Sequence, residues 1–187
     1  KKLRDLKNRL RDLIKAGELN GVVIYGNDSY RYINDAKNFL NLDFTRLHTS
    51  KISYIFLISF IFFFNLSLSS IVIIQFLTTI ISSICLYLIG KKLFSKWVGL
   101  ISLFFFFNYI PIQLRNFYIL TEILFINLSI ILIYLCFFKQ ENKILIFFTS
   151  FFILFLRPQG FLIILSLFFT FILFGKLDKI YNIIFKI

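Results

Sequence analysis

The sequence predicts an all-α fold, a polytopic bundle of transmembrane helices, and three observations lead to this fold class. The chain is 59% hydrophobic with a mean hydropathy of +0.85, and it contains 28 Phe but only 2 Pro and 7 Gly. Apolar runs follow one another along most of the chain, and a soluble domain does not tolerate apolar runs of this length. None of the runs alternates with a period of two residues, which argues against membrane-spanning strands.

The apolar runs define a bundle over residues 52–175. The last run, 144–175, would be about 48 Å long as one helix, whereas the hydrocarbon core of a bilayer is roughly 30 Å thick. Arg157-Pro158-Gln159-Gly160 lies in its middle, so we expect a turn there with a helix on each side. The shorter run 52–66 is either a re-entrant segment or a short span. The expected spans are 71–89, 97–114, 117–138, 144–157 and 160–175.

The segments outside the bundle are more polar. Residues 1–20 begin with leucines on one helical face and Lys and Arg on the other, which predicts a basic amphipathic helix lying on a membrane surface. Residues 21–51 are expected to contain a turn at Gly26–Asp28 and a short amphipathic helix after it. Residues 176–187 are expected to form a cytoplasmic interfacial segment. The chain has no Met and opens with Lys1-Lys2, so we expect it to be an amino-terminal fragment of a longer protein.

The charged residues predict the orientation of the bundle. The positive-inside rule places three short basic clusters in the cytoplasm, and these are Lys91–Lys96, Lys139–Lys143 and Lys176–Lys179. The expected spans then alternate in direction, and the isolated charges Arg115, Glu122 and Arg157 fall near the outer boundary of the core. An ionisable side chain in hydrocarbon costs about 2.5–3.5 kcal/mol on insertion scales, so isolated membrane charges mark candidate functional sites.

Composition also excludes some classes of function. The net charge is +12, but the basic residues from residue 71 onward lie mostly in short loops beside apolar spans, and the positive-inside rule explains them without a nucleic-acid partner. Cys85 and Cys136 both fall inside expected spans, so we interpret them as free thiols acting as small apolar side chains, and no metal site is predicted. His48, the single histidine, is interpreted as a solvated loop residue.

Five short motifs, in this order, resemble the GT-C membrane glycosyltransferases, especially the dolichyl-phosphate-mannose protein mannosyltransferases and the bacterial aminoarabinose transferases. Asp28–Tyr32 is similar to the Asp-(Glu)-x-x-Tyr loop of this family, and Ala36–Leu40 to the Ala-x-x-Leu helix that follows it. Leu86–Phe94 resembles the loop after the next span. Leu120–Glu122 resembles the acidic opening of a later helix, and Arg157–Gly160 a basic Pro/Gly step. The resemblance covers roughly residues 21–175.

The resemblance implies an integral membrane enzyme of the plasma membrane, multi-pass and with its site facing outside. Such enzymes move a sugar from a polyprenyl-phosphate carrier to a glycan, lipid or protein acceptor. The resemblance also implies that residues 21–51 form an extracytoplasmic loop, which favours a re-entrant segment at 52–66. The basic charge of the first 51 residues instead favours a cytoplasmic location for them. Membrane lipids and the lipid-linked sugar are the expected partners. The sequence does not indicate a cofactor.

The resemblance also implies roles for five residues. Asp28 is the candidate catalytic base, and the alternative is an ordinary turn residue before a helix. Arg157 is a candidate for holding the lipid phosphate, and the alternative is an arginine that extends to the headgroups. Glu122 either orients Arg115 or Arg157, binds a metal or the sugar, or forms a structural ion pair with Arg115. Arg115 itself is a further binding candidate or a boundary residue, and Tyr32 is a candidate for stacking on a sugar.

Three other functions remain open from the sequence. A flippase or polymerase of lipid-linked glycans would also have many spans with embedded arginines. A small-solute transporter would need polar sites at the midplane and broken helices, often in repeated halves, and here the isolated charges lie at the outer edge instead. A non-catalytic membrane scaffold is the third alternative.

Overall fold

The computed structural model describes residues 28–43 and 51–174, and within these ranges the chain forms helices and no strand, which confirms the all-α class. The expected helix at 1–20, His48 and the segment 176–187 lie outside the described residues. The helices are α2 (Ser29–Leu40), α3 (Ile52–Phe63), α4 (Ser69–Leu93), α5 (Lys96–Asn108), α6 (Ile110–Arg115), α7 (Thr121–Phe138), α8 (Lys143–Leu156) and α9 (Gly160–Phe174).

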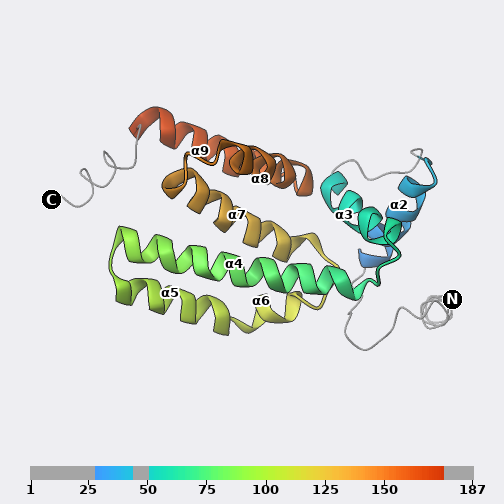
Figure 1. Ribbon diagram of the computed structural model, residues 1–187, viewed down its shortest axis with the longest axis horizontal. Helices are drawn as coiled ribbons and strands as arrows, with labels where there is room; N and C mark the ends of the chain where they lie inside the picture. The colour runs from blue at the N-terminus through green and yellow to red at the C-terminus, as the bar shows by residue number, and fades with distance from the viewer. Residues whose placement is uncertain (1–27, 44–50, 175–187) are drawn as a thin grey trace.

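The helices are arranged as a bundle with a small helical pair at one end (Figure 1). α4 and α5 form one antiparallel pair, α7 packs against α4, and α8 and α9 pack on the other side of α7. α2 and α3 pack against each other at the end of the bundle where α4, α7 and α9 begin and where α8 ends (Figure 1). Residues far apart in the sequence therefore meet at this end.

Two helices are long and apolar enough to span a membrane, and these are α4 with 25 residues and α7 with 18. In the most apolar 18-residue stretch of each helix, 39% of the residues are buried in α4 and 44% in α7. The remaining residues of α7 are all partly buried, whereas α4 also exposes several large apolar side chains, among them Ile73, Leu77 and Ile84. The other apolar helices are shorter, and the longest of them, α9, has 15 residues, or about 23 Å of helix.

The structure divides the expected span 97–114 into two helices. α5 ends at Asn108, and α6 begins at Ile110 with Pro111 in its first turn. Proline lacks an N–H and clashes with the preceding turn, so it ends one helix and is tolerated at the start of the next. The expected span 117–138 likewise begins later, at Thr121, because residues 116–120 form turns that connect α6 to α7.

Two glycines allow α4 and α5 to approach closely. An added Cβ atom at Gly99 would lie 2.6 Å from the carbonyl oxygen of Tyr87, and one at Gly90 would lie 2.9 Å from the Cα atom of Gly99. The backbones of the two helices are therefore in direct contact near their connection. Ser95 begins α5 because its hydroxyl accepts a hydrogen bond from the Val98 amide (3.3 Å), an N-cap interaction.

The turn between α8 and α9 lies at the expected Arg-Pro-Gln-Gly step. The Gly160 amide donates to the Arg157 carbonyl (2.9 Å), and Pro158 occupies the second position of this turn. An added Cβ atom at Gly160 would lie 2.4 Å from the carbonyl oxygen of Ile153, so only glycine lets α9 start this close to α8. The arginine is thereby held at the end of α8.

The pair α2 and α3 contributes seven of the 13 buried residues of the larger apolar cluster. Buried side chains of α2, among them Ile33 and Ala36, face Ile55 and Ile58 of α3. α3 has 12 residues, about 18 Å of helix, and it ends well before residue 66. This length is short for crossing a bilayer core of roughly 30 Å.

Candidate functional site

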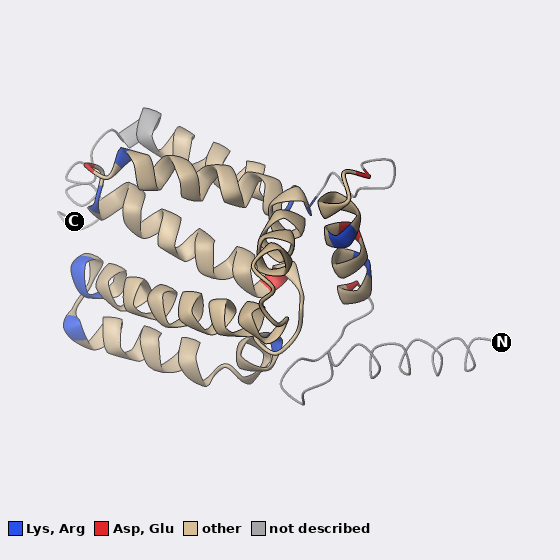
Figure 2. Ribbon diagram, turned by 45° about the vertical axis from the view of Figure 1, so that its right-hand side comes forward, with Lys and Arg blue, Asp and Glu red and all other residues tan. Residues whose placement is uncertain are grey.

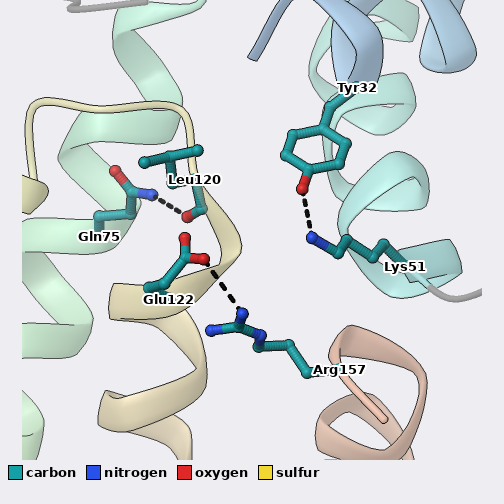
Figure 3. Close-up of polar contacts among 6 residues, drawn as sticks. All are labelled: Tyr32, Lys51, Gln75, Leu120, Glu122 and Arg157. Carbon is teal, nitrogen blue, oxygen red and sulfur yellow. Dashed lines mark hydrogen bonds and ion pairs between the residues drawn. The ribbon is translucent and has the colours of Figure 1, made fainter. Parts of the chain in front are cut away.

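An ion pair joins the start of α7 to the end of α8. Arg157 Nη2 lies 3.2 Å from Glu122 Oε1, and the two side chains are 25% and 27% exposed (Figure 3). Glu122 is in the first turn of α7, where the helix dipole stabilises a carboxylate. Arg157 follows the last residue of α8 in an extended conformation, which the turn to α9 maintains. Residues 35 positions apart therefore form one charged group.

The ion pair leaves hydrogen-bonding capacity unused. A guanidinium has five N–H donors in a planar arrangement, and the pair with Glu122 uses one terminal nitrogen. The Arg157 guanidinium also lies over the ring of Phe125, 5.9 Å from its centroid, which restricts its orientation. Oε2 of Glu122 is buried and has no hydrogen-bond partner among the described residues. The pair is thus positioned by its own contacts and can still bind a further polar group.

Gln75 fixes the backbone next to this pair. Its Nε2 atom donates to the Leu120 carbonyl (3.1 Å), immediately before α7 begins (Figure 3), and lies 3.4 Å from the Tyr54 hydroxyl. Gln75 is fully buried, and its Oε1 atom has no partner within the described part of the chain. A buried amide with one unused acceptor so close to an ion pair is unusual, because buried polar atoms are normally hydrogen-bonded.

Asp28 lies at the same end of the molecule. It precedes α2, it is exposed, and its side chain makes no capping hydrogen bond to that helix. The neighbouring Ser29 is fully buried, and its hydroxyl donates to the carbonyl of Ile119 (2.9 Å), two residues before α7. This long-range bond anchors Asp28 near the start of the helix that carries Glu122. Asp28 is in a turn directly before the helix, as the turn interpretation expected, but its side chain does not cap that helix.

Tyr32 is placed differently from the sequence expectation. Its side chain is 2% exposed and packs edge-on against Tyr54, with ring centroids 5.4 Å apart. Lys51 Nζ donates to the Tyr32 hydroxyl (Figure 3) and lies 5.0 Å from the ring centroid. Little of the ring is available for stacking on a sugar. The geometry instead makes Tyr32 a residue that positions Lys51, a second cation on this side of the molecule that sequence reasoning did not identify.

Arg115 is not part of the ion pair. It is the last residue of α6 and is exposed, and among the residues that the structure describes it forms no ion pair. The structural pairing of Glu122 with Arg115 that the sequence left open is therefore replaced by pairing with Arg157. The structure thus brings two of the five predicted site residues, Glu122 and Arg157, into contact.

Polar side chains also connect α4 to α7 inside the bundle, and sequence reasoning missed this group. We call it the polar seam, and it consists of Thr79, Ser82, Asn116 and Asn127. Asn127 lies 2.9 Å from the Ser82 hydroxyl and 2.8 Å from the Thr79 hydroxyl, and Asn116 lies 2.9 Å from Thr79. All four are buried, with 0–1% exposure. They hydrogen-bond to one another across the helix interface.

The candidate site contains carboxylates, cations and neutral hydrogen-bond donors. Within residues 28–43 and 51–174, no group of three or more His, Cys, Asp or Glu residues is close enough to hold a metal ion. Comparison with known protein families, with curated proteins and with solved structures finds no match to this chain. A function for this chain is therefore inferred from its residues and their geometry.

Proposed function

We propose that this chain belongs to an integral membrane glycosyltransferase of the GT-C type, which moves a sugar from a polyprenyl-phosphate donor to an extracytoplasmic acceptor. The observation that carries the proposal is the positioned Glu122–Arg157 ion pair at the end of the bundle where Ser29 anchors the Asp28 loop. This combination places a cation with free donors on the same side as an exposed carboxylate.

A multi-pass location in the membrane is supported by the apolar surface of the bundle. α4 and α7 have the length and composition of spans. The helices around them also expose large apolar side chains, for example Phe104 and Phe105 of α5 and Phe147, Phe148 and Phe151 of α8. Exposed apolar surface of this extent on both sides of the bundle is rare on soluble monomers. We therefore propose that α5, α8 and α9 lie in the membrane beside the two longer helices.

The chemistry needs a base and a cation. The acceptor hydroxyl attacks the anomeric carbon of the sugar while the bond from that carbon to the lipid phosphate breaks. The Asp28 carboxylate would take the hydroxyl proton, and its exposure leaves it accessible to an acceptor. The Arg157 guanidinium would hold the departing phosphate, with Glu122 keeping it in orientation. Lys51 is a second candidate for contact with the phosphate.

The interior of the bundle argues against a transport pathway. A transporter needs polar groups that line a cavity near the midplane. The polar groups of the seam are instead buried and bonded to each other, with Ser82, Asn116 and Asn127 fully inaccessible to solvent. They fill the interface between two helices, so we favour an enzyme whose reactive groups lie at one end of the bundle.

Sugar transfer by membranes that contain the full-length gene product tests the proposal. With a radiolabelled polyprenyl-phosphate sugar as donor, Asp28→Asn should abolish transfer while donor binding persists, and Arg157→Ala should weaken donor binding. Asp43→Asn and Lys143→Ala, exposed charges of the same two types away from the site, are the matched controls and should keep wild-type activity. Normal turnover in Asp28→Asn at equal expression would overturn the catalytic role.

Sidedness gives a second test. Asn34 and Gln140 are exposed residues at opposite ends of the molecule, and Cys85 and Cys136 can be replaced to leave single-cysteine variants. In intact cells, an impermeant thiol reagent should label Asn34→Cys, whereas Gln140→Cys should react only after permeabilisation. The reverse pattern would place Asp28 in the cytoplasm and exclude an extracytoplasmic site.

A further inference from the structure

A basic cavity lies at the opposite end of the bundle from the candidate site. It has a volume of about 360 Å³ and lies where α4 and α7 end. Figure 2 shows the basic residues gathered at this end, where α4 turns into α5 and α7 into α8. The residues that line the cavity are Leu88, Lys91, Lys92, Tyr134, Phe138 and Lys139.

The cavity has an excess of positive charge. Lys91, Lys92 and Lys139 contribute three ammonium groups, and among the described residues the carboxylate that pairs with them is Glu141, which lies 3.7 Å from Lys139 and is 67% exposed. The carboxyl ends of α4 and α7 each carry a partial negative charge of about half an elementary charge. The three lysines, less the Glu141 carboxylate and the two helix ends, leave a net charge of about +1. This charge matches the single negative charge of a phosphodiester group.

The walls of the cavity combine this charge with apolar surface. Lys92 Nζ lies 4.7 Å from the centroid of the Phe138 ring, and the Tyr134 ring lies beside Phe138 with centroids 5.7 Å apart. Leu88 adds an aliphatic wall. Trp97, at the start of α5 on the same end, is 73% exposed, as is typical of residues at the boundary between hydrocarbon and water.

We propose that this cavity binds the phosphate headgroup of an anionic phospholipid. A lysine cluster at helix ends is already expected from membrane orientation, but orientation requires no concave shape and no aromatic wall. A cavity with lysines, an aromatic wall and adjacent lipid-facing helices fits a headgroup whose acyl chains continue along the bundle. Free inorganic phosphate has the same charge chemistry but gains nothing from Leu88 and Phe138, so the lipid is the favoured source.

Native mass spectrometry of the full chain in dodecyl maltoside tests the proposal, with phosphatidylglycerol and phosphatidylcholine added at equal concentrations. The wild-type protein should retain one phosphatidylglycerol in preference to phosphatidylcholine. Each lysine near an anionic headgroup contributes about a fivefold factor in affinity. Replacing Lys91, Lys92 and Lys139 together by Gln should therefore reduce the retained phosphatidylglycerol roughly 100-fold, and Lys96→Gln with Lys143→Gln, at the same end but outside the cavity, is the matched control.

Two further measurements test the lipid site without depending on the triple lysine variant. Glu141→Gln removes the carboxylate that competes for Lys139, so it should tighten phosphatidylglycerol binding by a fewfold even if the triple variant is unstable. Inorganic phosphate at 10 mM should not displace the lipid. Equal retention of the two lipids by the wild-type protein, equal loss in both lysine variants, or weaker binding by Glu141→Gln would overturn the proposal. Displacement by free phosphate would overturn the lipid as the source.

Discussion

The substitution Asn127→Ala tests how α4 and α7 are held together. The Asn127 side chain lies close to three hydroxyls of α4, those of Thr79 (2.8 Å), Ser82 (2.9 Å) and Thr78 (3.3 Å). Each of these hydroxyls also lies within hydrogen-bonding distance of a carbonyl of its own helix, to which it can donate its single proton once Asn127 is removed, so the substitution leaves none of them without a partner. A hydrogen bond between transmembrane helices contributes about 0.6 kcal/mol on average, and we therefore expect the free energy of unfolding to fall by roughly 2 kcal/mol.

Equilibrium unfolding in mixed micelles, with a rising fraction of dodecyl sulfate and far-ultraviolet circular dichroism as the signal, measures this loss. Asn108→Ala is the matched control, because Asn108 is exposed and its side chain donates to the Phe104 carbonyl of its own helix (2.8 Å). It should stay within about 0.5 kcal/mol of the wild-type protein. Ser82→Ala completes a double-mutant cycle with an expected coupling of about 0.6 kcal/mol. Equal stability of the two asparagine variants, or no coupling, would refute a hydrogen-bonded contact between α4 and α7.

Three other predictions follow from single contacts. Gly99→Ala should destabilise the protein by about 1–3 kcal/mol in the same unfolding assay, because the new Cβ atom would lie 2.6 Å from the Tyr87 carbonyl oxygen; an unchanged midpoint would contradict the close packing of α4 and α5. Cys85 and Cys136 are buried and should resist maleimide in native micelles but react after unfolding, and fast labelling of the native protein would show that these helix faces are open. Glu122→Gln should cost under about 1 kcal/mol of stability, since its ion pair is partly exposed, and a loss of several kcal/mol would mean that the pair is fully desolvated.

The order of the helices could be predicted from the charges and from the glycine and proline positions. Lys139–Lys143 falls at the connection between α7 and α8, and the turn at Arg157–Gly160 separates α8 from α9 as expected. These signals are strong because a charge or a proline inside an apolar helix carries a large energetic cost. The break at Pro111 was missed, although Asn108 and Gln113 on either side of it are polar, because the run 97–114 has about the length of one span.

The candidate site could be predicted only in part. The sequence placed Glu122 and Arg157 at the same boundary, since both are isolated charges at the ends of apolar runs. It left open which arginine pairs with the glutamate, because pairing depends on which helices are neighbours, and α7 packs against α8. The burial of Tyr32 depends in the same way on α3, whose packing against α2 is a tertiary contact.

The polar seam had a signal that sequence reasoning could have used. Gln75, Thr79 and Ser82 are spaced at i, i+4 and i+7, so they lie on one face of α4, and Asn127 is a polar residue inside the neighbouring apolar run. A polar stripe on an otherwise apolar helix predicts a contact with another helix, because lipid offers no hydrogen-bond partners. The sequence could not show that the partner is α7, which lies further along the chain.

The length of α7 connects the two ends of the bundle. Its 18 residues span about 27 Å, and a charge stands at each end, Glu122 in the first turn and Lys139 immediately after the last residue. Sliding this helix along its axis by one turn in either direction would move one of these charges into the hydrocarbon, at a cost of a few kcal/mol. In the proposed membrane location, the same constraint therefore keeps Glu122 at the boundary, where Arg157, immediately after α8, meets it. In the proposed membrane location, the position of the candidate site thus follows from how the bundle fits the membrane, and moving the lysine end by inserting a turn into α7 is expected to move the ion pair as well.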